Sequence, residues 1–139
     1  MASEKGEADV VSGQAGRWAI WITGSRSWSD ADSIRAVLGR FPGGSLVLHG
    51  DDLGADRLAD VVARGLQMPT AKVPYIEWMG PSGGAARNKL IGEILAGLKH
   101  QGWSTLVLAF GEGRGAEDGA KIARDLGLTV RAFREPRAD

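Results

Sequence analysis

The sequence predicts an α/β fold, a Rossmann-like three-layer α/β/α arrangement with a mainly parallel five-stranded sheet between two layers of helices. Short runs rich in β-branched and aromatic residues recur along the chain, segments with apolar residues at helical spacing separate them, and two of the runs are apolar almost throughout. Strands that alternate with helices need crossover connections, which make neighbouring strands parallel. Strands covered on both faces are apolar on both sides.

The predicted strands are the runs with the strongest β-forming composition. In the fifth run the polar residues Thr129 and Arg131 alternate with apolar neighbours, which is typical of a strand at the edge of a sheet. The five runs cover residues 18–23, 45–49, 71–74, 105–110 and 128–133.

Four helices are predicted between the strands, because apolar residues there recur at intervals of three and four. Ser29 followed by Asp32 predicts a capping pair at the start of the first helix. Asp60 and Arg64 lie one turn apart on the second helix, and Gly127 ends the fourth. The apolar positions are Ile34, Val37, Leu38 and Phe41 in the first helix, Ala55, Leu58, Ala59, Val62 and Leu66 in the second, and Leu90, Ile91, Ile94, Leu95 and Leu98 in the third, and the fourth helix covers about 116–126.

The length and composition favour a single domain. The chain has 139 residues, of which 43% are hydrophobic and 24% charged, and both fractions are ordinary for a globular protein. Residues 1–16 show no periodicity. We therefore expect a disordered N-terminal tail at 1–16, one Rossmann-like domain at 17–135 and a short C-terminal tail at 136–139.

The charge balance and residue usage exclude several classes of protein. Seventeen Lys and Arg residues balance seventeen Asp and Glu residues, and this zero net charge disfavours a partner such as duplex nucleic acid. The chain has no cysteine, and its two histidines, His49 and His100, are far apart, so we expect no disulfide and no metal site. The longest apolar stretches have five residues and no apolar block follows the N-terminus, so we expect a cytoplasmic protein with no membrane partner.

The residues that follow each strand are the candidates for function, because ligands of open parallel sheets bind beyond the carboxyl ends of the strands. After the first strand, Gly24 and Ser25 allow the backbone to approach a ligand closely. Arg26 offers donors for a phosphate or a carboxylate, and Trp28 offers a stacking face. The alternative is a simple helix-capping turn with a solvated arginine.

The second strand is followed by Gly50 and Gly54, which suggest a loop that wraps a ligand at the start of a helix. Asp51 and Asp52 would repel a phosphate, so they bind ribose hydroxyls or cap the helix. Asp56 is a candidate for a ribose, or it complements the helix dipole. His49 ends the strand and either contacts the ligand or has a structural role.

The third strand is followed by a longer loop, 75–86, that carries Trp78 and then opens a helix with Arg87, Asn88 and Lys89. Basic residues at a helix start oppose the helix dipole unless an anion or a carboxylate lies there. Arg87 therefore binds an anionic ligand or pairs with a structural carboxylate such as Asp56 or Glu77.

The fourth strand is followed by Gly111, Gly113 and Gly115, alternate glycines before a helix that predict an anion cradle. Glu117 and Asp118 are available there for a ribose or for acid–base chemistry. The dinucleotide fingerprint is absent after the first strand and no Walker A sequence occurs, so the sequence disfavours an ordinary dehydrogenase or P-loop ATPase. We expect Arg26, Asp56, Arg87 and the glycine turn to meet around one hollow.

Taken together, these loops resemble the YspA-like branch of the SLOG superfamily, Rossmann-like domains related to DprA and to the LOG phosphoribohydrolases. The resemblance covers residues 18–133 and implies a nucleotide-derived ligand, ADP-ribose-like or related to NAD. In LOG enzymes an arginine at the helix start and a glutamate after a glycine-rich loop cleave nucleoside monophosphates. Arg87 matches the arginine, but Gly119 stands where the glutamate is expected, Glu112 replaces a glycine and Ala116 a threonine. The matching residues are Gly24, Ser25, Arg26 and Trp28, then His49, Gly50, Gly54, Ala55, Asp56 and Arg57, then Trp78, Gly84, Arg87 and Asn88, and finally Ala109, Phe110, Gly111, Gly113 and Gly115.

The functional prediction is a domain that binds a nucleotide-derived ligand without a required cofactor. Arg26, Arg87 and the backbone at 113–115, including Arg114, would hold phosphate, Asp56 or Glu117 ribose, and Trp28 or Trp78 the base. The alternative is an N-glycosidase that uses Arg87, with Glu117 or Asp118 stabilising the oxocarbenium charge. A DprA-like binder of single strands is disfavoured by the zero net charge, and a domain that only mediates contacts is the fourth reading. A homo-oligomer is left open.

Overall fold

The computed structural model describes residues 17–135, and they form one sheet of five strands. The strand order is β3-β2-β1-β4-β5, and every neighbouring pair is parallel. The predicted fold class is therefore confirmed. The expected tails at 1–16 and 136–139 lie outside the described residues. The strands are β1 (Trp18–Gly24), β2 (Leu46–His49), β3 (Thr70–Lys72), β4 (Ser104–Phe110) and β5 (Val130–Phe133).

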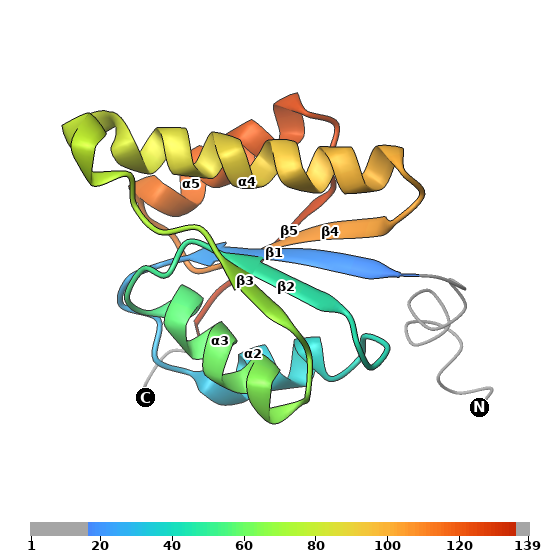
Figure 1. The fold of residues 1–139 in the computed structure, drawn as a ribbon. Coiled ribbons are helices and arrows are strands. Elements are labelled where there is room, and N and C mark those ends of the chain that lie inside the picture. Colours follow the sequence, from blue (N-terminus) through green and yellow to red (C-terminus); the bar gives the residue numbers. More distant parts are fainter. Residues whose placement is uncertain (1–16, 136–139) are drawn as a thin grey trace.

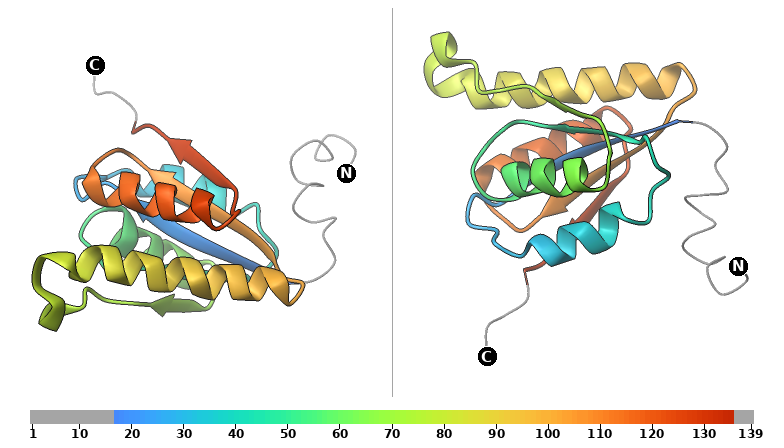
Figure 2. Two further views of the ribbon diagram at one scale, coloured as in Figure 1. Left: turned by 90° about the horizontal axis from the view of Figure 1, so that it is seen from above. Right: turned by 60° about the horizontal axis from the view of Figure 1, so that its bottom comes forward.

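The helices cover both faces of the sheet (Figure 1). Helices α2 (Ala31–Leu38) and α3 (Ala55–Gly65) lie on one face. The other face carries α4 (Gly83–His100) and α5 (Arg114–Asp125), and a short 3₁₀ helix, η2 (Glu77–Ser82), leads directly into α4. Figure 2 shows the same three layers from two further directions.

The central strand β1 supplies side chains to both cores. Ile20 and Ile22 face α2 and α3, and Ala19 and Trp21 face α4 and α5, as expected from the alternation of side chains along a strand. All four are fully or almost fully buried. Burial of one large apolar side chain contributes about 1.5–3 kcal/mol, so β1 anchors both helical layers.

The predicted starts of two elements are wrong by a few residues, for local reasons. The side chain of Asp30, rather than a pair of Ser29 and Asp32, caps α2 by accepting the N–H of Ser33 at 3.4 Å. Strand β5 begins at Val130 rather than at residue 128, because the N–H of Leu128 closes the end of α5 on the carbonyl of Ala123. Short helix-terminating bonds of this kind leave little trace in an apolar pattern.

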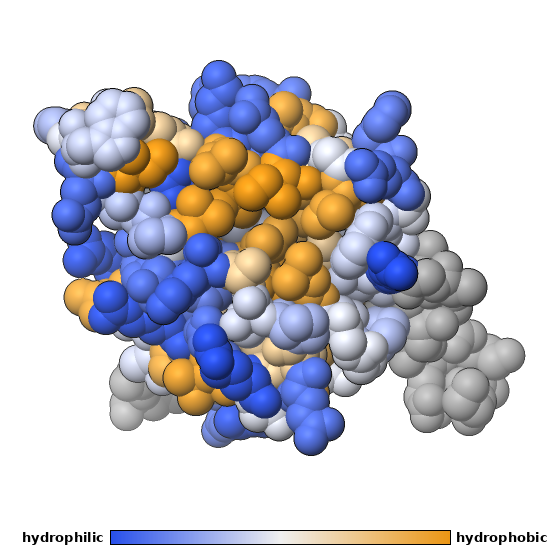
Figure 3. All heavy atoms as spheres, in the orientation of Figure 1, coloured by the Kyte–Doolittle hydropathy of each residue, from blue (hydrophilic) through white to orange (hydrophobic). Residues whose placement is uncertain are grey.

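Two predicted core residues of α4, Leu90 and Ile94, are 43% and 38% exposed. Helix α4 packs on β1, β4 and α5, and the described part of the chain does not cover its other side. Figure 3 shows an apolar surface between α4 and β3. The expectation of a homo-oligomer stays a prediction. None of the helices in residues 17–135 combines the length and the hydrophobicity that crossing a bilayer requires.

Candidate functional site

A hollow of about 670 Å³ opens at the carboxyl edge of the sheet, where the loops after β1, β2 and β4 meet the start of α4. This volume is in the range of small-molecule sites, roughly 300–1,000 Å³. The chain leaves β1 toward one face of the sheet and β4 toward the other, so a crevice forms between the two loops. The predicted site residues that line the hollow are Gly24, Ser25, Arg26, Gly50, Asp56, Arg87, Asn88, Gly113, Arg114, Gly115 and Asp118.

The expected meeting of Arg26, Asp56, Arg87 and the glycine turn around one hollow is therefore confirmed as geometry. These residues come from four segments that are distant in the sequence: the loop after β1, the first turn of α3, the N-terminal part of α4, and the turn that opens α5. The parallel sheet brings them together, because all its strands end at the same edge.

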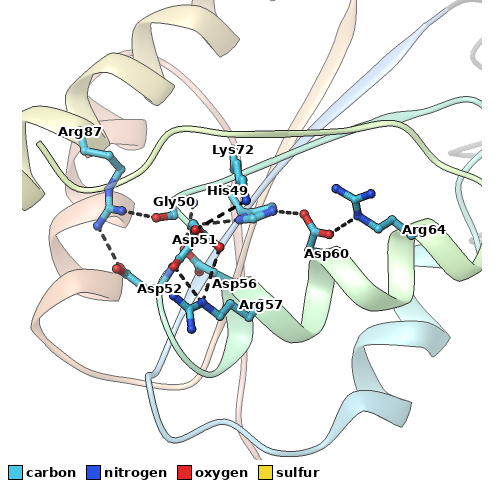
Figure 4. A network of polar contacts seen from close by, with 10 residues as sticks. All are labelled: His49, Gly50, Asp51, Asp52, Asp56, Arg57, Asp60, Arg64, Lys72 and Arg87. Atoms are coloured by element: carbon cyan, nitrogen blue, oxygen red, sulfur yellow. Dashed lines mark hydrogen bonds and ion pairs between the residues drawn. The ribbon is translucent and has the colours of Figure 1, made fainter.

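Arg87 is buried, lines the hollow and is held by three hydrogen bonds, of which Figure 4 shows those to Gly50 and Asp52. Its Nη1 donates to the carbonyl oxygen of Gly50 at 2.7 Å, Nη2 to the carboxylate of Asp52 at 2.9 Å, and Nε to Oδ1 of Asn88 at 2.8 Å. The sequence left open whether Arg87 binds an anionic ligand or pairs with a structural carboxylate such as Asp56 or Glu77. Arg87 does pair with a carboxylate, but with that of Asp52. A guanidinium has five N–H donors, so two are left for a ligand.

Asn88 extends this network to the opposite wall. Its Nδ2 donates to Oδ2 of Asp118 at 2.9 Å and lies 3.5 Å from the carbonyl oxygen of Gly115. Asp118 is on α5, whereas Arg87 and Asn88 are on α4. The amide therefore fixes the carboxylate of Asp118 relative to the Arg87 guanidinium.

Asp56 is a buried carboxyl beside the same loop. Its Oδ2 accepts the N–H of Gly50 at 2.9 Å and that of Asp52 at 3.4 Å. Burial, with the nearby charge of Asp52, raises the pKa of Asp56 to about 7, although the two backbone hydrogen bonds and Arg87 act in the opposite direction. Asp56 therefore exchanges a proton near neutral pH.

The second oxygen of Asp56 is available to a ligand. Oδ1 makes no hydrogen bond with residues 17–135, and in that part of the chain every fully buried side-chain nitrogen or oxygen has a partner. Oδ1 is therefore not fully buried, and Asp56 lines the hollow. Its carboxyl can accept a hydroxyl proton when ionised and donate one when neutral.

The opposite side of the hollow carries unused donors. Neither Arg26 nor Arg114 makes an ion pair or a side-chain hydrogen bond with the described residues. Helix α5 begins after Gly113, at φ +136°, and no side chain of residues 17–135 caps its first N–H groups. Free N–H groups at the start of a helix attract anions, and two arginines beside them add to this attraction.

The charged groups of the hollow are mixed, which suits a ligand with both anionic and hydroxyl groups. Within residues 17–135 no cluster of three or more histidine and carboxylate side chains could hold a metal ion. The basic groups are Arg26, Arg87 and Arg114, and the acidic groups are Asp52, Asp56, Asp118 and Glu112.

His49 does not reach the hollow, so its predicted ligand contact is wrong. It is fully buried, with Nδ1 accepting the N–H of Asp51 at 2.9 Å and Nε2 at 2.6 Å from Oδ2 of Asp60. Since Nδ1 is an acceptor, Nε2 carries the proton and donates to Asp60. This bond and the Arg64 side chain hold the pKa of the Asp60 carboxyl below its usual range. His49 therefore has the structural role that the sequence also allowed: it holds the loop that carries Asp51 and Asp52 in place.

The sequence predicts that Trp28 or Trp78 stacks on the base, and neither of them lines the hollow. Trp28 is 2% exposed, packs edge-on against Phe110 at 5.4 Å between ring centroids, and donates from Nε1 to the carbonyl of Asp30 at 2.9 Å. Its ring faces are used by the core. Trp78 is 86% exposed on η2 and does not line the hollow.

Four further candidates also lie outside the hollow. Arg57 points to Asp51, donating from Nε to its carbonyl at 3.2 Å, and Glu117 is exposed on the outer side of α5. Gly54, at φ +81°, is required for packing, because a Cβ there would overlap the backbone of Ser25 and Arg26. Gly111 lines a smaller neighbouring hollow, together with the edge of Trp28.

Sequence reasoning missed the rim of the site. Tyr75 and Pro81 line the hollow, and the hydroxyl of Tyr75 donates to the carbonyl of Gly80. Tyr75 is 40% exposed. The available signal was their position in the longest loop, 75–86, immediately before Arg87.

The comparisons with known proteins identify no family. No family model matches the chain. The chain is 38% identical over 79 residues to the Gene 61 protein of Mycobacterium phage D29, an alignment that covers 50% of this chain and 63% of that relative. The chain thus spans less than two thirds of the length of the relative that it matches.

Proposed function

We propose that the hollow at the carboxyl edge of the sheet binds a nucleotide-derived ligand. The observation that carries the proposal is that one site offers both a carboxyl that can bind hydroxyls and donors that can bind an anion. Asp56, a buried carboxyl with one oxygen that has no partner in residues 17–135, lies on one side. On the other side lie the first N–H groups of α5 and two arginines, which no side chain of the same residues caps or pairs. A phosphorylated sugar presents both hydroxyls and an anion.

The phosphate would lie at the start of α5. There the backbone of 113–115, Arg114 and Arg26 supply donors that the described residues do not use. The anion would also offset the cost of basic groups beside a helix N-terminus. Arg87 would contribute its two remaining N–H groups while staying bound to Asp52.

The ribose would lie against Asp56, whose free oxygen accepts a hydroxyl proton. The base would lie beside Tyr75, which is 40% exposed and offers an aromatic side chain to the hollow, whereas Trp21 and Trp28 are buried. The resemblance to the YspA-like branch of the SLOG superfamily points to the same ligand class and stays a prediction.

Thermal denaturation with AMP, ADP-ribose and NAD tests this proposal. A ligand at 100 times its Kd stabilises the folded state by about 2.7 kcal/mol, which raises the Tm by roughly 10 °C for a domain of this size. Arg114→Ala removes a donor from the first turn of α5, and Arg124→Ala removes an exposed arginine from the last turn of the same helix. We expect the first variant to weaken binding and the second to leave it unchanged. No shift with any nucleotide at millimolar concentration would refute the proposal.

An N-glycosidase is the second candidate, and one observation favours it: a buried carboxyl that exchanges its proton near pH 7 is suited to general acid catalysis. The expected catalytic groups do not support it equally. Asp118 lines the hollow, but Glu117 does not, and a Cβ at Gly119 would lie 3.3 Å from both Thr23 and Trp21.

Chromatography of a nucleoside monophosphate after incubation with the protein tests this candidate. Release of free base that Asp56→Asn abolishes supports an enzyme, and no release over hours excludes it.

A further inference from the structure

Asp52 is the carboxylate that neutralises Arg87 inside the hollow. Its Oδ2 lies 2.9 Å from Nη2 of Arg87, and both side chains line the hollow (Figure 4). The side chain of Arg87 is 5% exposed and that of Asp52 is 37% exposed, so the carboxylate is the solvent-side partner of a buried cation. A ligand that enters the hollow therefore meets Arg87 with its positive charge already paired.

The loop after β2 fixes the position of Asp52. The N–H of Asp52 donates to Oδ2 of Asp56 at 3.4 Å, and the N–H of the preceding residue, Asp51, donates to Nδ1 of the buried His49 at 2.9 Å. Asp51 has φ +59°, a left-handed conformation that is uncommon for residues other than glycine. Backbone conformations of this kind cluster at ligand sites, where the surrounding structure maintains them. The Asp52 carboxylate is thus held against Arg87 by a loop with few other conformations.

The lining of the hollow has no excess of positive charge. Among residues 17–135, Asp52 is the one lining carboxylate that pairs with an arginine, since Asp118 is bound to Asn88 and Glu112 forms no ion pair. Loss of the Asp52 charge would therefore add one positive charge to the balance, and this charge would lie at Arg87. The acidic side chains of the lining are Asp52, Asp56, Asp118 and Glu112, and the basic ones are Arg26, Arg87 and Arg114.

We infer that Asp52 is a specificity residue that limits how much negative charge a ligand of the hollow can usefully carry, because it keeps Arg87 neutralised. This inference rests on the proposed function, since it requires that the hollow binds a nucleotide. A first phosphate would meet unpaired donors at the start of α5, whereas a further anionic group near Arg87 would meet the Asp52 carboxylate. Additional phosphate charge therefore brings no gain in affinity while Asp52 is ionised, and brings a gain once that charge is removed.

Asp52→Asn tests the inference, because asparagine keeps an oxygen that can accept from Arg87 and removes the charge. Isothermal titration compares adenosine, AMP, ADP and ATP without divalent cations, so that each nucleotide keeps its full charge. In wild type we expect AMP, ADP and ATP to bind with similar affinity. In Asp52→Asn we expect unchanged binding of adenosine and about tenfold tighter binding of AMP, the rough effect of one unit charge in a protein site. The gain should be larger for ADP and largest for ATP, and a damaged fold would not tighten binding.

Two controls isolate the charge of Asp52. This charge helps to raise the pKa of Asp56 to about 7, so its removal lowers that pKa, and titration at about pH 8.5 keeps Asp56 ionised in both proteins. Asp51→Asn is the matched variant on the same loop. Asp51 lies 3.5 Å from Nε of Arg57 and does not line the hollow, so its substitution should change none of the four affinities appreciably.

The outcomes separate this inference from the proposed function. No gain in Asp52→Asn, or an equal gain for AMP, ADP and ATP, overturns the role of Asp52 and leaves nucleotide binding standing. The same gain for adenosine, or in Asp51→Asn, also overturns it. Failure of AMP, ADP and ATP to bind either protein refutes the proposed function and the inference together.

Discussion

The guanidinium of Arg87 lies directly against the backbone of Gly50, with Nη1 2.7 Å from the Gly50 carbonyl oxygen. The contact joins α4 to the loop after β2, two segments distant in the sequence. It also explains why position 50 is a glycine, because a Cβ there would overlap the guanidinium.

Gly50→Ala is therefore expected to destabilise the protein. The new methyl group must displace Arg87, and overpacking of a buried site costs typically about 1–3 kcal/mol. Urea denaturation measures the change in the free energy of unfolding. Gly43→Ala is the control, because a Cβ at that exposed position meets nothing within 4 Å, and it should be close to neutral. A neutral Gly50→Ala would contradict the contact.

Arg87→Lys is expected to cost about 2–4 kcal/mol, although it keeps the charge. An ammonium group cannot satisfy Gly50, Asp52 and Asn88 from the positions of three guanidinium nitrogens, so buried acceptors lose their partners. Arg64→Lys, at an exposed pair with Asp60, should change the free energy of unfolding by less than about 1 kcal/mol. Equal effects of the two substitutions would show that the three hydrogen bonds do not stabilise the fold.

The raised pKa of Asp56 predicts a specific pH dependence of stability. The carboxyl binds its proton more tightly in the folded state, where its pKa is about 7, than in the unfolded chain, where an aspartate has its ordinary pKa of 3.8. Its contribution is therefore fully present below about pH 4 and is lost as the pH rises through 7, with a total of up to about 4 kcal/mol. Between pH 4 and 7 wild type should lose stability relative to Asp56→Asn, as followed by urea denaturation at each pH. Asp125→Asn, at an exposed pair with Lys121, should follow wild type, and a pH-independent difference for Asp56→Asn would contradict the raised pKa.

His49→Phe is expected to destabilise the loop after β2 without touching the hollow. Phenylalanine fills a similar space but removes the acceptor for the Asp51 N–H and the donor to Asp60, at a cost of about 2–3 kcal/mol. Hydrogen exchange should show faster exchange of the Asp51 amide. His100→Phe, at the exposed end of α4, is the control. Unchanged exchange at Asp51 would contradict the structural role of His49.

The fold could be predicted from the sequence because its signals are local and redundant. Apolar runs such as those in β1 and β4 indicate strands covered on both faces, and the helical spacing between runs requires parallel connections. The meeting of Arg26, Asp56 and Arg87 also followed, since it depends only on the common direction of the strands.

The orientation of individual side chains could not be predicted in the same way. Trp28 follows β1 and His49 ends β2, so both were candidates for the site. The sequence does not show that Trp28 packs on Phe110 or that His49 bonds to Asp60. The choice of Asp52 over Asp56 as the partner of Arg87 depends on a few ångströms of loop geometry. Leu90 is exposed because the described residues leave one side of α4 uncovered, which no local pattern records.

Under the proposed function, the arginines that stabilise the fold are separate from those that would bind the ligand. Arg87 is committed to three intramolecular bonds, whereas Arg26 and Arg114 have no such commitment within residues 17–135. Libraries that randomise the latter two positions should yield mostly folded proteins with altered ligand preference, and libraries at position 87 should yield mostly unfolded ones. If the proposed function holds, changing these two arginines alone would alter ligand preference without unfolding the domain.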